Sequence, residues 1–201
     1  KAFKEFQSLS NVKEKFNKEI NLDPNFKFDK TKTILNLKWN DIFYSEDNSF
    51  KNFNYKNQNN LIFKSKSLTK HKADKYILYE NNNLITSDIK GNIIVFSINE
   101  NKKKINYNFY KKRYKKIDKI INLSVKNNII YASDNLGFIY ALNYNTNKIL
   151  WAKNYKIPFR SNIKIFKNKI ILANQNNTLY FIDKKNGEIL KTVPTEESPF
   201  K

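Results

Sequence analysis

The sequence predicts an all-β fold, and residues 129–151 show the reason most clearly. Three short apolar runs in this stretch are separated by two clusters rich in Asn, Asp and Gly, which is the usual signal of strands joined by turns. The same pattern returns at residues 76–98 and 163–182, so the chain contains an internal repeat. We therefore expect three units that share one plan of strands and turns.

The length of the repeat predicts how these units assemble. Aligning Gly91 with Gly137 gives a step of 46 residues, and aligning Leu142 with Ile182 gives a step of 40. A period of about 40–46 residues with four strands per unit is typical of a β-propeller blade. A single sheet has two apolar faces, and both become buried when blades stack side by side. The repeat thus predicts an incomplete β-propeller of four-stranded antiparallel blades, about three of them clear and one degenerate.

The predicted units follow one another along the chain. Residues 1–29 carry apolar residues at spacings of three and four, which favours a short helix, with an extended N-terminal arm as the alternative. We interpret residues 30–74 as the degenerate blade and residues 75–119 and 120–162 as two regular blades. Residues 163–201 contain a further blade and a truncated end.

The first two of these units are the least regular. Asp23-Pro24-Asn25 is expected to end the N-terminal segment, because proline and its neighbours favour turns. Strands of the degenerate blade are expected at residues 33–39, 42–44, 50–55 and 61–63, where apolar and aromatic residues gather between Asn-rich clusters.

Four residues define the structural repeat. The turn before the third strand of each unit needs a residue that tolerates positive φ. Gly91 and Gly137 provide it in two units, and Asn177, the next most tolerant residue type, provides it in the third. We predict that all three share a left-handed or turn conformation. Trp151 closes a repeated strand, and we interpret it as a residue that packs between blades rather than one that stacks on a ligand.

Composition limits the classes of function. The chain has 201 residues, 40% of them hydrophobic, so it can bury a substantial core. It has no Cys, which excludes disulfides and thiolate metal sites. Its net charge of +20 favours anionic partners, while a Lys- and Asn-rich surface is also typical of a genome poor in G and C. No apolar run approaches the length of a membrane span.

Few residues suggest catalysis. Asp88 and Asp134 are the only acidic residues that recur in register, and we interpret each as capping its own tight turn. His71, the only histidine, lies in a polar loop without a nucleophile or a metal-ligand partner. The sequence contains neither a P-loop nor a dinucleotide fingerprint. We therefore expect no enzyme activity, no cofactor and no metal site.

Two basic runs allow a different interpretation. Lys102-Lys103-Lys104 and residues 111–116 place basic side chains near Tyr110 and Tyr114, a pattern that can bind phosphates and stack on bases. The alternative is a solvated strand and loop that is attracted to anionic lipid headgroups. We favour the alternative and expect no nucleic-acid partner.

The blade motif resembles a known repeat. Gly137, Tyr140-Ala141-Leu142 and Ile149-Leu150-Trp151 resemble the pyrroloquinoline-quinone (PQQ) type of propeller repeat. Residues 186–190 look like the same turn and strand, with Lys191 in place of the tryptophan. The resemblance implies a propeller fold. Propeller repeats serve many functions, so a quinone-repeat oxidoreductase fragment stays open as an alternative.

A closer resemblance is to the BamB family, the lipoprotein subunits of the outer-membrane β-barrel assembly machinery, in its low-GC alphaproteobacterial form. The segments that carry it are residues 39–44, 61–65, 84–88, 149–161, 173–177 and 194–197. The resemblance implies a non-catalytic scaffold in the periplasm, associated with the outer membrane. The implied partners are the barrel-assembly pore protein, unfolded outer-membrane proteins and the membrane surface. That family has an eight-bladed ring and a lipidated Cys anchor, and this sequence has no Cys.

One surface site is predicted. Pro158, Phe159 and Arg160 form the candidate partner contact, because an apolar residue beside Arg in an inter-blade loop is typical hot-spot chemistry. The alternative is that Phe159 packs between blades and Arg160 is solvated or ion-paired. Free sheet edges are a second means of binding, because they can accept a strand from another chain.

Overall fold

The structure is a computed structural model, and it divides the chain into two compact units, Lys1–Lys32 and Thr33–Lys201. It describes residues 23–27, 32–33, 38–45, 48, 52–54, 60–61, 63–110 and 114–195. In the first unit the backbone N–H of Phe26 donates to the carbonyl of Asp23 at 2.8 Å, which closes a turn where the sequence predicts one. The helix or arm predicted for residues 1–29 otherwise lies outside the described residues.

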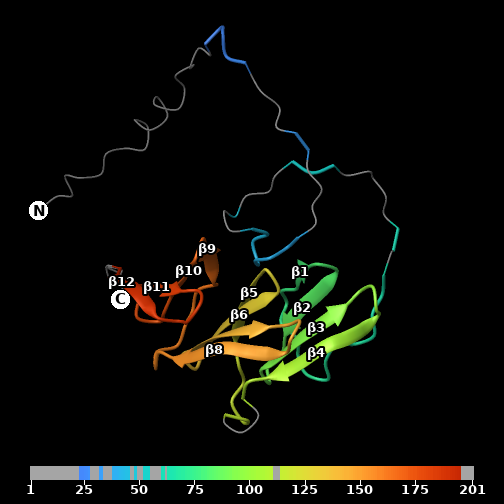
Figure 1. The fold of residues 1–201 in the computed structure, drawn as a ribbon, viewed down its shortest axis with the longest axis vertical. Coiled ribbons are helices and arrows are strands. Elements are labelled where there is room, and N and C mark those ends of the chain that lie inside the picture. The colour runs from blue at the N-terminus through green and yellow to red at the C-terminus, as the bar shows by residue number, and fades with distance from the viewer. Residues whose placement is uncertain are drawn as a thin grey trace, which may run out of the picture. The chain divides into compact units, whose positions relative to one another are not determined.

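The described residues of the second unit form three four-stranded antiparallel sheets, the blades of an incomplete β-propeller (Figure 1). Blade 1 consists of β1 (Leu78–Glu80), β2 (Asn83–Ser87), β3 (Asn92–Ser97) and β4 (Lys102–Asn108). Blade 2 consists of β5 (Ile121–Lys126), β6 (Ile129–Asp134), β7 (Phe138–Asn143) and β8 (Lys148–Asn154). Blade 3 consists of β9 (Lys164–Phe166), β10 (Lys169–Ala173), β11 (Thr178–Asp183) and β12 (Ile189–Pro194). The predicted all-β fold is confirmed, and no helix in the described part of the chain is long and apolar enough to cross a membrane.

The blades repeat the same register. In blade 2 Ile130 lies opposite Leu142, and 40 residues later Ile170 lies opposite Ile182 in blade 3. The pairing of the third and fourth strands shifts at one equivalent place in every blade: between Val95 and Phe96, between Ala141 and Leu142, and between Phe181 and Ile182. A bulge increases the local twist of a strand. The outer strand of each blade is therefore turned in the same way.

Asparagine closes the first hairpin of two blades. Asn81 and Asn82 have φ of 51° and 58°, and Asn127 and Asn128 have φ of 53° and 65°. Two successive residues with positive φ form the turn whose twist matches that of the paired strands. Asn tolerates this conformation better than other non-glycine residues. Part of the high Asn content is therefore structural.

Two apolar clusters join the blades. Along β7, Tyr140 and Leu142 pack toward blade 1, whereas Ile139 and Ala141 pack toward blade 3. All four side chains are fully buried. The alternation of a strand thus places every second residue in a different inter-blade interface. This explains why β7 is apolar at successive positions.

The described residues before blade 1 form isolated bridges rather than the expected strands. The strand predicted at residues 42–44 is wrong, because this stretch is a turn in which Tyr44 N–H donates to the Asp41 carbonyl at 2.9 Å. The Asp41 carboxylate also accepts from Phe43 N–H at 3.0 Å, and such a local bond competes with strand pairing. The strands predicted at 33–39, 50–55 and 61–63 lie partly outside the described residues.

Candidate functional site

A short stretch of chain lies where the inner strands of the three blades converge. We call residues 39–45 the axial segment. Trp39 exchanges two backbone hydrogen bonds of 2.8 Å with Tyr79 of β1, and the carbonyl of Asn40 accepts from Val125 N–H of β5 at 3.0 Å. The carboxylate of Asp41 forms an ion pair with Lys164 of β9 at 2.9 Å. Three successive residues thus bond to three successive blades.

The ion pair of the axial segment is largely removed from water. Asp41 is 3% exposed, and its side chain and that of Lys164 are 4% and 24% exposed. The Lys164 ammonium also donates to the side chain of Asn48 and lies 5.3 Å from the centre of the Phe43 ring. A buried charge is tolerated only when its partners are close and well placed. These contacts therefore fix the axial segment against blade 3.

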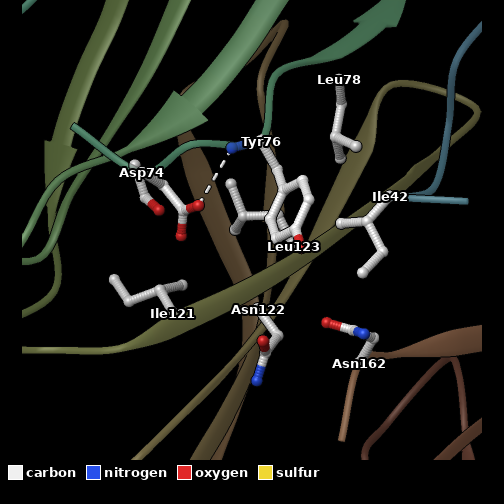
Figure 2. A pocket seen from close by; sticks show the side chains of 9 residues that line it. Ile42, Asp74, Tyr76, Leu78, Ile121, Asn122, Leu123 and Asn162 are labelled. Atoms are coloured by element: carbon white, nitrogen blue, oxygen red, sulfur yellow. Dashed lines mark hydrogen bonds between the residues drawn. The ribbon is translucent and has the colours of Figure 1, made fainter.

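A narrow hollow lies beside the axial segment (Figure 2). Its lining consists of Ile42, Asp74, Tyr76, Leu78, Ser87, Ile121, Asn122, Leu123 and Asn162. Four of the nine lining residues are aliphatic and four are polar. The one carboxylate among them, on Asp74, accepts from Tyr76 N–H at 3.0 Å (Figure 2). Among the described residues no three His, Cys, Asp or Glu side chains lie close enough to hold a metal ion.

Each blade has one polar residue that organises the turn between its second and third strands. One side-chain oxygen of this residue accepts from the backbone N–H groups two and four positions later, at 2.8 to 3.1 Å. The residues are Asp88, Asp134 and Asn174. The capping role predicted for the two aspartates is confirmed. Asn174 was missed, although the repeat step of 40 from Asp134 points to it.

The two aspartates differ in the donors that bond to their second carboxylate oxygen and in the direction of their pKa shift. Burial by itself raises the pKa of Asp88, but hydrogen bonds from Thr69 and Asn92 outweigh it and hold the pKa below its usual value. Burial dominates at Asp134 and raises its pKa, against the opposing bond from the Tyr110 hydroxyl. Both carboxylates are thus engaged by the chain's own donors.

The three residues predicted to share a turn conformation do so. Gly91, Gly137 and Asn177 have φ of 86°, 88° and 56°, and each directly precedes the third strand of its blade. A side chain at Gly91 would collide with the ring of Tyr110. The repeat alignment therefore predicts backbone conformation as well as strand position.

Trp151 packs between blades, as the sequence suggests. It is 9% exposed, and its indole N–H donates to the carbonyl of Lys184 in blade 3 at 3.0 Å. A Cβ atom at Gly187 would lie 2.6 Å from the Trp151 ring. The glycine thus allows the indole to lie against the backbone of the next blade.

The predicted contact at residues 158–160 divides into a buried and an exposed part. Phe159 is 3% exposed and its ring lies 5.6 Å from that of Tyr155 and 5.8 Å from that of Tyr180. It therefore has the packing role that the sequence left as the alternative, and it offers no exposed apolar anchor. Pro158 is half-buried and Arg160 is exposed. Contact of Arg160 with a partner stays a prediction.

The class of protein that these features define is a partial β-propeller built from one repeated blade. Comparison with known proteins agrees at the level of the fold, although no family model and no curated protein matches the sequence. Several solved propellers of the PQQ-repeat type resemble it at low identity.

Three solved structures illustrate the likeness. BamB from Moraxella catarrhalis matches with a TM-score of 0.51 and 14% identity, over 60% of this chain and 35% of that chain. Quinohemoprotein alcohol dehydrogenase from Comamonas testosteroni matches with a TM-score of 0.63 and 13% identity, over 78% of this chain and 27% of that chain. The computationally designed Ika4 protein matches with a TM-score of 0.51 and 15% identity, over 67% of this chain and 83% of that chain. The chain thus spans about a third of the BamB structure.

Proposed function

We propose that the chain is a non-catalytic propeller scaffold that assists the assembly of outer-membrane β-barrel proteins. It acts in the periplasm, at the outer membrane, and binds the barrel-assembly pore protein and unfolded outer-membrane proteins. The observation that carries the scaffold part of the proposal is the axial segment. Its bonds to β1, β5 and β9 occupy the place where the inner strands of the three described blades converge. The likeness to BamB and the sequence resemblance support the particular role.

Binding then depends on the loops and edges of the blades. Arg160 is exposed at the junction of blades 2 and 3, where its own backbone N–H donates to the Ala173 carbonyl at 3.2 Å. A guanidinium held on such a fixed backbone suits a carboxylate of the pore protein, because its five donors keep a rigid planar geometry. We assign the pore-protein contact to Arg160.

Unfolded outer-membrane proteins suit the edge of blade 3. Within the described residues no strand pairs with the outer side of β12. Ile189 and Leu190 on this strand are both 49% exposed. Lys191 and Pro194, of the residue types that usually protect an edge strand, lie further along it, so the start of β12 is the open part of the edge. An extended chain of alternating apolar residues can add to such an edge through backbone hydrogen bonds.

The test is binding to the pore protein of the same organism. Arg160→Glu is expected to weaken binding at least about tenfold, because a buried interfacial Arg contributes more than about 1.4 kcal/mol. Lys148→Glu makes the same change of charge at the first residue of β8, whereas Arg160 lies beyond the last, and is the matched control. Equal loss in the two variants, or no binding by the parent chain, would refute the proposal.

A quinone-dependent oxidoreductase is the second candidate, because the dehydrogenase from Comamonas testosteroni matches with the higher TM-score of 0.63. The residues present do not fit the cofactor of such an enzyme. A calcium-bound quinone needs several oxygen ligands. Among the described residues the hollow supplies one carboxylate, which Tyr76 N–H already engages, and three neutral polar side chains, on Ser87, Asn122 and Asn162. That is fewer than the about six to eight oxygen ligands that calcium takes. Retention of a calcium and quinone complex after gel filtration would favour this candidate.

A further inference from the structure

The connection between β4 and β5 displays apolar side chains to solvent beside basic ones. We call residues 114–120 the β4–β5 tip. In Figure 1 the yellow-green connection that contains it projects beyond the ends of the strands. Tyr114 is 38% exposed, Ile117 is 45% exposed and Ile120 is 65% exposed. Lys115 and Lys116 lie between them and are exposed as well.

The tip is held firmly at its base. The backbone N–H of Lys119 donates to the Ile89 carbonyl of blade 1 at 2.8 Å. The backbone N–H of Ile120 donates to the side chain of Asn135 in blade 2 at 3.0 Å. The Lys119 ammonium turns back to the Tyr114 carbonyl and is buried. The exposed isoleucines therefore stand on a fixed support that two blades provide.

The blade repeat does not require this exposure. The equivalent connection between β8 and β9 turns its large side chains inward, since Phe159 is 3% exposed and the Tyr155 hydroxyl donates to the Gly187 carbonyl at 2.6 Å. At the end of the β4–β5 connection the residue that corresponds to Phe159 is Ile121, and it is buried too. Ile117 and Ile120 are exposed in addition to it, and no large apolar residue of the β8–β9 connection is similarly exposed. A feature that one blade junction has and the next lacks calls for a local reason.

The charges around the tip favour an anionic surface. Its one carboxylate, on Asp118, is paired with Lys90 at 2.7 Å and so has its charge neutralised. Lys115 and Lys116 remain at the outer turn, and the whole chain carries a net charge of +20. Such a charge attracts a protein to a surface rich in acidic lipid, with about 1 kcal/mol for each basic residue near the surface.

We propose that the β4–β5 tip is a membrane-docking site for a bilayer that contains anionic lipid. Ile117 and Ile120 enter the boundary between headgroups and acyl chains, where apolar side chains are stabilised. Lys115 and Lys116 remain at the level of the headgroup phosphates, with their stems along the apolar layer. Nucleic acid fits the tip less well, because its two most exposed apolar side chains, Ile117 and Ile120, have no ring face on which a base can stack, and the Tyr114 ring already packs against Phe138. The proposal stands independently of any role in barrel assembly.

Flotation with vesicles tests this docking. Vesicles of phosphatidylcholine with about 30% phosphatidylglycerol carry the surface charge that the lysines need, and pure phosphatidylcholine vesicles do not. We expect binding to the charged vesicles, about tenfold weaker for Ile117→Ser and about fivefold weaker for each of Lys115→Gln and Lys116→Gln.

Matched variants elsewhere separate docking from general attraction. Leu190→Ser removes an equally exposed apolar side chain from β12, and Lys102→Gln removes one charge from β4. Each is expected to change binding less than about twofold, since neither residue touches the bilayer.

Three outcomes would overturn the proposal. The first is equal loss in the control and tip variants, which would show attraction by net charge alone. The second is equal binding to charged and uncharged vesicles. The third is no vesicle binding together with retention on a mixed-sequence DNA duplex that Lys115→Gln weakens, which would assign the tip to nucleic acid. An Ile117→Trp variant gives a check that does not depend on affinity, because its fluorescence should shift to the blue with charged vesicles.

Discussion

Replacing Asp134 with alanine removes the acceptor at which three donors of two blades meet. The backbone N–H groups of Leu136 and Phe138 both donate to one carboxylate oxygen at 2.8 Å. The hydroxyl of Tyr110, from the connection that follows blade 1, donates to the other oxygen. Asp134 is fully buried and Tyr110 is 3% exposed, so solvent does not readily replace the lost acceptor.

The expected loss of stability follows from the number of donors. A buried donor that loses its acceptor costs about 1–3 kcal/mol, so three donors predict a loss of at least about 3 kcal/mol. Asp134→Asn is the matched variant, because Asn174 already accepts the two equivalent backbone bonds in blade 3. The amide retains the turn and avoids a buried charge, so we expect a change below about 1 kcal/mol at neutral pH.

Urea unfolding followed by tryptophan fluorescence measures both variants, since Trp151 lies in the interface between blades 2 and 3. With a slope of about 2 kcal/mol per molar urea, the midpoint of Asp134→Ala should fall by about 1.5 M and that of Asp134→Asn by less than about 0.5 M. An unchanged midpoint for the alanine variant, or the same loss in both variants, would refute a turn-organising role for this side chain.

Two further predictions use the same unfolding measurement. The raised pKa of Asp134 makes its contribution to stability decrease as the pH rises above the usual carboxyl value of 3.8, whereas the lowered pKa of Asp88 makes its contribution decrease as the pH falls below that value. The stability of Asp134→Asn relative to the parent should therefore increase as the pH rises above about 4. The stability of Asp88→Asn relative to the parent should decrease as the pH rises toward about 4 from below. If both variants ran parallel to the parent at every pH, the assignment would be contradicted. Gly187→Ala should cost about 2–4 kcal/mol, because φ is +74° and the new Cβ atom meets the Trp151 ring. Asn177→Gly, at a left-handed position without that contact, is its control and should change stability by less than about 1 kcal/mol.

Periodic features of the fold could be predicted from the sequence. The steps of 46 and 40 residues place Gly91, Gly137 and Asn177 at one turn, and all three have positive φ there. The reason is physical: in each blade the turn between the second and third strands needs a residue with positive φ at the same position. Asn174 belongs to the same set and could have been found by extending the alignment from Asp134 to the amide that replaces it.

Features that occur once could not be predicted in this way. The axial segment bonds to three blades through residues separated from it by about 40 to 120 positions, and a repeat alignment carries no signal for such contacts. The local turn at Asp41 replaced an expected strand for the same reason, since its side chain competes with strand pairing. Phe159 also illustrates the limit, because the sequence of a loop does not tell whether an aromatic ring points into the protein or out of it.

The central claim is that the chain binds a protein partner and performs no quinone chemistry. Isothermal titration calorimetry compares the two directly, with the barrel-assembly pore protein of the same organism in one titration and calcium with pyrroloquinoline quinone in the other. We predict saturable binding of the pore protein that Arg160→Glu weakens, and no binding of the quinone. Saturable quinone binding without binding of the pore protein would contradict the claim.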